Sequence, residues 1–461
     1  MPAARQPFDL VVSGGTCLTP SGRVGADIGV RDGRIDAIGD LARADTRENL
    51  DATGLHVLPG VIDTQVHFRE PGGEHKEDLA SGTAAAVAGG VTAVFEMPNT
   101  DPATVSEAAV SDKLARAAGR AWCDHAFFVG AAAENVRELA RLERLAGVCG
   151  VKVFMGSSTG SLLVADDATL ERVLTAGVRR AAVHAEDETR LTERRRLAEE
   201  GARPHLHPVW RDEETALRAT ERLLRLARAT GRRVHVLHVT TADEMVLLKA
   251  HKDLATVEVT PQHLTLVAPE CYDRLDTRAQ MNPPIREAKH REALWRAVDD
   301  GTVDVIGSDH APHTLEEKAR PYPASPGGMP GVQTLVPVLL DHVAAGRLSL
   351  ERFVDLTAHG PARIYGMAGK GRLAAGYDAD LTLVDLAARR TITARLMLSK
   401  CGWSPFEGME VIGWPVATIV RGRAVMREGE LLGEPRGQPI RFQETVRSPA
   451  ADGEHRRVVD A

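Results

Sequence analysis

The chain lacks the features that mark several protein classes. Its five cysteines, Cys17, Cys123, Cys149, Cys271 and Cys401, are scattered without close pairs. This spacing argues against a disulfide framework and against a cysteine zinc site. No apolar run approaches the ~20 residues that cross a bilayer, and the first residues, MPAARQPFD, lack an apolar signal core. We therefore expect a cytoplasmic protein that does not bind membranes.

The chain also lacks internal repeats, low-complexity segments and an excess of positive charge. Its net charge is -7, and with 43% hydrophobic and 26% charged residues its composition is that of a globular protein. This balance gives no reason to expect nucleic acid as a partner, so we expect a small molecule. The 461 residues would suggest several domains, but barrel enzymes of this length often form one unit.

Alternating strand and helix patterns run through the middle of the chain. Apolar segments predict eight strands: 61–68, 91–96, 122–129, 150–155, 180–184, 233–239, 256–260 and 303–308. Segments rich in Ala, Leu, Glu and Arg predict helices between them, among them 107–118, 167–176, 213–230 and 289–299. The alternation predicts an α/β fold, a (β/α)8 TIM barrel with its active site at the C-terminal ends of the strands.

The two ends of the chain predict a second, smaller unit. Strand patterns occur at 9–12, 28–31, 34–38, 371–384 and 417–425, with Asp32-Gly33 as a hairpin turn. We expect these segments to form a small β-sandwich built from both chain ends. The predicted domains are residues 1–56 and 366–461 for the sandwich and residues 57–365 for the barrel. The polar tail from Ser448 to Ala461 predicts a frayed end.

The first predicted barrel strand ends in charged and ligand-type side chains. Because successive strand residues point to opposite faces, Gln65, His67 and Arg69 share one face. A solvated strand edge would explain this stripe, and Arg69 could form a surface ion pair with Glu70 or Glu74. The alternative is a binding site at the mouth of the barrel.

Lys152 lies in the fourth predicted strand, Gly150-Val151-Lys152-Val153-Phe154-Met155. A buried ammonium is costly unless its charge is neutralised. The side chain could extend to the surface. Alternatively it stays buried, loses its proton and reacts with carbon dioxide to form a carbamate, an anionic ligand that can bridge two metals.

Three further strands end in candidate ligands. His184 ends the fifth strand, and Asp309 follows the eighth. In the sixth strand His235 and His238 are three residues apart, so we expect only one of them to enter the barrel, and His238 is nearer the C-terminal end. Together with His67, these residues at one end of successive strands predict a metal site.

The chain resembles the dihydroorotases of the amidohydrolase superfamily, in the larger bacterial class that is also similar to hydantoinases and allantoinases. The resemblance covers nearly the whole chain and rests on these segments: His67-Phe68-Arg69-Glu70-Pro71-Gly72, Met97-Pro98-Asn99-Thr100, Lys152-Val153-Phe154-Met155, His184-Ala185-Glu186-Asp187, Met281-Asn282-Pro283-Pro284, Asp309-His310-Ala311-Pro312-His313 and Asp378-Ala379-Asp380-Leu381.

The resemblance implies one or two divalent ions, usually zinc, bridged by carboxylated Lys152 and a hydroxide. One ion would be held also by His184 and His238, and the other by His67, Asp309 and the first member of a His-x-His pair. That first member is Gln65 in this chain. A glutamine amide is a weak neutral ligand where zinc prefers imidazole, so occupancy of the second position is open.

The resemblance also implies a mechanism and a substrate. Metal would activate water and polarise a cyclic amide, and Asp309 would move the proton to the leaving nitrogen. In the biosynthetic direction carbamoyl aspartate would close to dihydroorotate. Arg69, Asn99 and His313 match the positions with which the family holds the substrate carboxylate, and Asn282 is a further candidate. Asn99 could instead cap a helix, and Asn282 could be a turn residue.

Three functions remain open. The first is dihydroorotase activity in pyrimidine biosynthesis, and the second is hydantoinase or allantoinase activity. The third, motivated by Gln65, is a catalytically silent subunit that supports aspartate transcarbamoylase. We also expect a homo-oligomer. We interpret His205-Leu206-His207-Pro208 as a loop, and we exclude His310 and Lys76-Glu77-Asp78 from the site.

Overall fold

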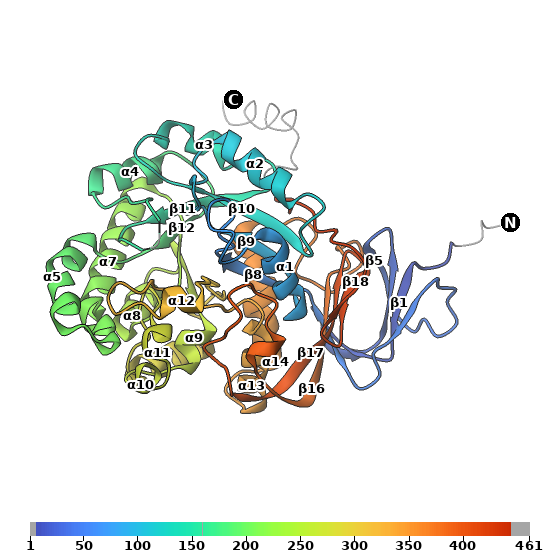
Figure 1. Cartoon of the computed structure of the whole chain (residues 1–461). Coiled ribbons are helices and arrows are strands. Elements are labelled where there is room, and N and C mark those ends of the chain that lie inside the picture. Colours follow the sequence, from blue (N-terminus) through green and yellow to red (C-terminus); the bar gives the residue numbers. More distant parts are fainter. Residues whose placement is uncertain (1–5, 159, 444–461) are drawn as a thin grey trace, which may run out of the picture.

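Eight parallel strands form a barrel in the computed structural model, which describes residues 6–158 and 160–443 (Figure 1). The strands are β8 (Val61–Val66), β9 (Val91–Glu96), β10 (Asp124–Gly130), β11 (Val148–Phe154), β12 (Ala181–His184), β13 (Val234–Val236), β14 (Ala255–Val259) and β15 (Val305–Ile306). Neighbours in the sheet follow chain order. A bridge from Val66 to His310 closes the ring, and the His67 N–H donates to the His310 carbonyl at 2.7 Å. The predicted barrel and its eight strands are confirmed.

Helices surround the barrel (Figure 1). They are α1 (Leu79–Ala88), α2 (Glu107–Ala117), α3 (Leu139–Leu142), α4 (Asp167–Thr175), α5 (Glu188–Gly201), α6 (His207–Trp210), α7 (Glu213–Thr230), α8 (Ala242–Lys249), α9 (Pro261–Thr265), α10 (Glu270–Leu275), α11 (Ala288–Asp299), α12 (Leu315–Lys318), α13 (Leu335–Ala344), α14 (Leu350–Val354) and α15 (Gly360–Tyr365). In α7 the Asp212 side chain accepts from the Thr215 N–H, and Gly231 ends the helix at φ +70°. These are the expected start and stop signals of a helix. The four predicted helices match α2, α4, α7 and α11.

Two further sheets pack as a sandwich beside the barrel (Figure 1). One consists of N-terminal strands, and the other combines strands from both ends of the chain. One sheet has the order β5 (Arg34–Gly39), β4 (Asp27–Arg31), β1 (Leu10–Ser13), β6 (Asn49–Asp51). The other has the order β19 (Glu430–Leu431), β18 (Arg423–Arg427), β17 (Glu410–Val420), β16 (Leu381–Thr391), β7 (His56–Pro59), β2 (Thr16–Thr19), β3 (Gly22–Gly25). Val12, Ile28, Val57, Leu383 and Ile419 form part of the buried core between the sheets.

Two strand predictions at the C-terminal end need correction. The segment 371–384 becomes a strand only from Leu381, because turns occupy most of the residues before it. The segment 417–425 is a hairpin of β17 and β18, which reverses at Arg421 and Gly422, both with positive φ. The predicted domain boundaries stay a prediction, and β7 lies across the first of them. The predicted frayed tail, 448–461, lies outside the described residues.

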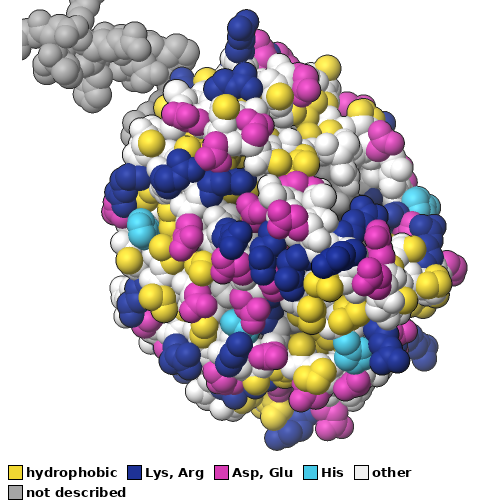
Figure 2. Space-filling model, turned by 90° about the vertical axis from the view of Figure 1, so that its left-hand side faces the viewer, with side chains coloured by type: hydrophobic (Ala, Val, Ile, Leu, Met, Phe, Trp, Pro, Cys, Tyr) yellow, Lys and Arg dark blue, Asp and Glu magenta, His cyan; other side chains and the backbone are white. Residues whose placement is uncertain are grey.

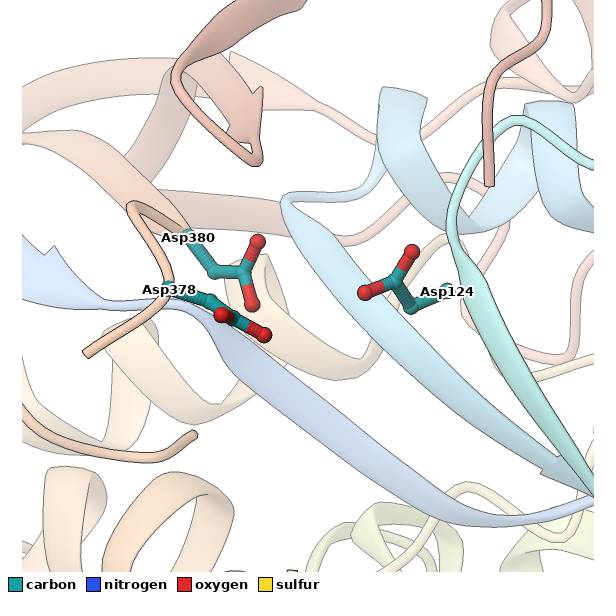
Figure 3. Close-up of side chains that lie close together, drawn as sticks. All are labelled: Asp124, Asp378 and Asp380. Atoms are coloured by element: carbon teal, nitrogen blue, oxygen red, sulfur yellow. The ribbon is translucent and has the colours of Figure 1, made fainter. Parts of the chain in front are cut away.

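A buried charged cluster joins the sandwich to the N-terminal end of the barrel. Asp124 begins β10, and Asp378 and Asp380 come from the segment before β16 (Figure 3). Their carboxylates lie close enough to share a cation. That cation is Lys370, whose Nζ lies 2.6 Å from Asp124, 2.5 Å from Asp380 and 3.3 Å from Asp378. Arg421 adds a second positive charge, 2.9 Å from Asp124. Arg34 lies 3.7 Å from Asp378 at the edge of the cluster. The buried charges of this junction are therefore paired within the chain.

The surface carries both signs of charge. On the face shown in Figure 2, Lys and Arg side chains are interspersed with Asp and Glu, and no single sign dominates. This face therefore carries no extended positive patch. Within residues 6–158 and 160–443, no helix combines the length and apolar character needed to cross a membrane.

Candidate active site

A cavity of about 20 Å³ lies at the C-terminal ends of the barrel strands. Nine of the ten predicted site residues line it: Gln65, His67, Arg69, Asn99, Lys152, His184, His238, Asn282 and Asp309. Three of these, Arg69, His238 and Asp309, have positive φ values of 64°, 38° and 43°. Residues other than glycine rarely adopt this conformation, which is typical of functional sites held by their surroundings.

The His184 ring is fixed by a buried carboxylate. Its Nε2 lies 2.9 Å from Glu186 Oε2, and Arg211 holds the same carboxylate at 2.5 Å. Although burial alone would raise the pKa of Glu186, Arg211 and His184 hold it well below its usual value. The carboxylate therefore accepts a hydrogen bond from the Nε2–H group of His184. This leaves a lone pair on Nδ1 of His184, which lies 3.1 Å from Nε2 of His238.

The His67 ring has the opposite tautomer. Its Nδ1 lies 2.7 Å from Asn99 Oδ1, an acceptor, so the proton sits on Nδ1. Burial lowers the pKa of His67 to about 4, which keeps the ring neutral. Nε2 therefore presents a lone pair to Asp309 Oδ1 at 3.3 Å. Two acceptors this close are repulsive unless a cation lies between them.

Lys152 is buried, so the surface alternative is wrong, and its Nζ has no hydrogen-bond partner among the described residues. The amine lies 4.6 Å from the centre of the Phe154 ring. Burial lowers the pKa of Lys152 to about 7, so a large share of the amine is neutral at physiological pH. An unpaired, readily deprotonated amine suits the predicted carbamate chemistry.

Gln65 is also buried in the wall of the cavity. Its Nε2 donates to Asp309 Oδ1 at 2.9 Å, while its Oε1 has no partner among the described residues. The amide thus binds the carboxylate and leaves one oxygen unsatisfied.

The structure contradicts the alternative roles of Arg69 in a surface ion pair and of Asn99 as a helix cap. Arg69 is buried, with Nε donating to the Pro312 carbonyl at 3.2 Å, while Glu70 pairs with Arg120 at 2.7 Å. Ser106, rather than Asn99, caps the next helix, α2. Arg69 and Asn99 line both the inner cavity and an outer cavity of about 470 Å³.

His313 is the one predicted residue outside the cavity lining. Its Nε2 lies 3.3 Å from Arg69 Nη2, so it contacts the cavity through Arg69. Lys76, which the sequence interpretation excluded, lies 3.2 Å from His313 Nδ1 on the other side. His310 points away from the cavity, towards Phe68 and Glu77, as predicted.

Two interpretations of histidines were wrong. His235 and His238 both enter the barrel, because β13 ends at Val236 and the backbone turns at His238. His235 Nδ1 lies 2.8 Å from Thr256 Oγ1 inside the barrel. The segment His205-Leu206-His207-Pro208 is not a loop but two short helical turns, since Pro208 suits the first turn of a helix.

Sequence reasoning missed three buried residues. Glu186 and Arg211 orient His184, and the spacing of two residues between His184 and Glu186 was the available signal. Glu258 lies in the apolar strand β14, where an acid is itself a signal. Its Oε2 lies 2.5 Å from Thr64 Oγ1, and burial raises the pKa of Glu258 to about 8, so it is mainly a neutral acid at pH 7.

Comparison with known proteins agrees with this fold. Residues 56–425 match the model of the amidohydrolase family. A dihydroorotase from Halobacterium salinarum is 39% identical, with 91% of this chain and 97% of the relative covered. An allantoinase from Rubrobacter xylanophilus is 37% identical, with 95% and 98% covered. The L-hydantoinase structure from Arthrobacter aurescens superposes with a TM-score of 0.89 at 30% identity, covering 94% and 99%. The chain belongs to the amidohydrolase family.

Members of this family are typically metal-dependent, and the side chains of this site suit divalent ions. His67 Nε2 presents a lone pair to the Asp309 carboxylate, and His184 Nδ1 has a lone pair beside His238. Lys152 Nζ is buried without a hydrogen-bond partner among the described residues. Imidazole nitrogen and carboxylate oxygen are the donors that Zn²⁺ accepts.

Proposed function

We propose that this chain is a dihydroorotase, which interconverts N-carbamoyl-L-aspartate and dihydroorotate. The observation that carries the proposal is Arg69, a buried guanidinium at the edge of the cluster formed by Lys152, His184 and Asp309. Its hydrogen bonds within the described chain go to neutral groups, a carbonyl and an imidazole. A substrate carboxylate would neutralise this charge, and the fork of Arg69 can bind both oxygens.

The proposed ion site has two halves. Lys152, as a carbamate, would hold both ions. His184 and His238 would complete one half, and His67, Asp309 and Gln65 the other. Divalent ions such as zinc would lower the pKa of a bound water and polarise the amide carbonyl.

The residues of the chain would bind the substrate and move its proton. Arg69 and Asn99 border the outer cavity and would hold the carboxylate there, with His313 supporting Arg69. Asp309 would take a proton at its carboxylate and deliver it to the leaving ring nitrogen. Gln65 holds Asp309 Oδ1 and so would orient that carboxylate.

The test is turnover by the purified, metal-loaded protein of dihydroorotate, hydantoin and allantoin. We expect dihydroorotate to be opened with the highest kcat/KM, and Arg69→Lys to lower that value about a hundredfold, because a bidentate contact is lost. A wild-type preference for allantoin or hydantoin would contradict the proposal.

Hydantoinase or allantoinase activity is the second candidate, favoured by the relatives of those names. Those substrates need not carry the carboxylate that Arg69 would bind. A silent subunit supporting aspartate transcarbamoylase would show no turnover of any of the three rings. Assembly as a homo-oligomer and a cytoplasmic location remain predictions, which size measurement in solution and localisation of the tagged protein would test.

A further inference from the structure

Helix α6 (His207–Trp210) contacts the cavity wall through Asn282, a residue to which the proposed function gives no role. His207 is buried, and its Nε2 lies 3.0 Å from Asn282 Oδ1 and 3.1 Å from the Met281 carbonyl. Both partners are acceptors, so the proton of His207 sits on Nε2. Its Nδ1 has no partner among the described residues, which agrees with a neutral ring protonated at Nε2.

The ring of His207 is held in place from two sides. Trp210 and Tyr322 both lie edge-on to it, each with its ring centre 5.9 Å away, at interplanar angles of 77° and 89°. Burial, together with the charge of Arg211, lowers the pKa of His207 to about 3, so the ring stays neutral at physiological pH. The Nε2–H group of His207, which donates to Asn282, is therefore fixed in both position and protonation.

Asn282 lies at the wall between the inner cavity and an outer cavity of about 250 Å³. Its Oδ1 is committed to His207, so the group left to face the cavity is the amide NH2. Gly327 leaves room for this arrangement, since a methyl group there would lie 3.0 Å from Asn282 Nδ2. An amide held this way presents its N–H groups as donors towards a ligand.

We propose that His207 is a positioning residue, which fixes the amide of Asn282 so that its N–H groups donate to a carbonyl oxygen of the bound cyclic amide. The inference rests on the proposed cyclic amide hydrolysis. It extends that proposal by making the Asn282 amide a fixed donor in the cavity wall. The residue that fixes this amide, His207, does not line the inner cavity.

The test compares two replacements of His207. His207→Phe keeps a buried ring but removes the donor, and we expect KM to rise about tenfold with kcat within about threefold. His207→Gln can still donate from its side-chain amide, so we expect KM within about threefold of wild type. His342→Phe is the matched control, because His342 is also buried beside an aromatic ring but does not line the cavity, and it should leave KM unchanged.

A double-mutant cycle separates positioning from general destabilisation. In an Asn282→Ala background, His207→Phe should no longer raise KM, because the group that it positions is absent. An equal rise in both backgrounds, or an unchanged KM for His207→Phe alone, would overturn the inference. If His207→Phe does not fold, Gly327→Ala, which crowds Asn282 from the other side, should raise KM instead, and an unchanged KM would count against the inference.

The experiment is run on whichever ring the wild type opens. Absence of dihydroorotate turnover would reject the proposed function, but the KM comparison on hydantoin or allantoin would still test His207. Absence of turnover of every ring would leave binding of dihydroorotate to the metal-loaded protein as the readout, with the same expected tenfold weakening in His207→Phe and none in His342→Phe.

Discussion

Each end of the barrel contains a buried lysine, and the two lysines differ in whether carboxylates surround the amine. At the N-terminal end, Lys370 contacts three carboxylates. Burial would lower the pKa of Lys370, but Asp124, Asp380 and Asp378 outweigh that effect and raise it. At the C-terminal end, Nζ of Lys152 has no hydrogen-bond partner in the part of the chain that the structure describes, and burial lowers the pKa of Lys152 to about 7. The charge of Lys370 is therefore balanced by carboxylates of the protein, whereas the amine of Lys152 is available for the proposed carbamate formation.

This difference indicates that Lys370 contributes to stability and Lys152 to function. A buried charge that is fully paired contributes a defined junction, and its removal leaves the partners unpaired. A buried amine without a partner contributes nothing to folding that would explain its position. Two unsatisfied groups lie at the mouth, where Gln65 Oε1 and Nζ of Lys152 have no hydrogen-bond partner within the described chain.

The largest expected effect is on turnover in Lys152→Met. We expect kcat to fall by about a thousandfold or more, because the proposed carbamate and the ions that it holds are lost together. The stability of the metal-free protein should change by less than about 1 kcal/mol, since an unpaired buried amine is replaced by an apolar chain of similar length. Turnover assays and urea unfolding after chelation measure the two quantities. A large loss of stability with normal turnover would reverse our assignment.

The next effect is on folding in Lys370→Met. Three buried carboxylates would lose their shared cation, and we expect unfolding to become easier by about 3–5 kcal/mol. Urea unfolding measures this, and Lys249→Met, which removes an exposed lysine paired with Asp300, should cost no more than about 1 kcal/mol. Equal effects of the two substitutions would show that the junction is not held by its charges.

The fold and the site differ in how far the sequence predicts them. The barrel strands follow from apolar segments of regular spacing, and the ligand-type residues follow from their positions at strand ends. The failures have physical causes. The interpretation of His235 assumed a regular strand, whereas β13 ends at Val236 and His238 adopts a positive φ. Alternation of side chains no longer applies beyond that point.

The supporting residues were harder to predict for another reason. Arg211 reaches Glu186, and His207 reaches Asn282, from a segment between two predicted strands. His205 and His207 have the spacing of a His-x-His ligand pair, but the segment does not end a predicted strand and was interpreted as a loop. Contacts between residues this far apart depend on the path of the connecting segment, which local patterns do not determine. Lys370 was missed in the same way, because its partners come from β10 and from the segment before β16.

The third prediction concerns pH. Carbon dioxide reacts with the neutral amine and releases one proton as the carbamate forms. Since burial lowers the pKa of Lys152 from 10.5 to about 7, the neutral fraction falls as pH drops through 7. At constant dissolved carbon dioxide, recovery of activity after chelation and reloading should be roughly tenfold slower at pH 6 than at pH 8. A 13C carbamate signal from labelled carbon dioxide would check the product, and its absence in active enzyme would contradict the modification.

The smallest expected effect is on ion content in Gln65→His. The wild-type amide donates to Asp309 and offers only a neutral oxygen, so the half of the site with His67 should hold its ion weakly. After dialysis we expect wild type to retain about one ion per chain and Gln65→His about two, because imidazole is the better zinc ligand. Elemental analysis gives the ratio. Gln262→His is the matched control, since Gln262 is equally buried but bonds the Ser308 carbonyl outside the cavity. Two tightly held ions in wild type would instead indicate that Gln65 Oε1 binds the second ion. That ion would then be the partner that this buried oxygen lacks among the described residues.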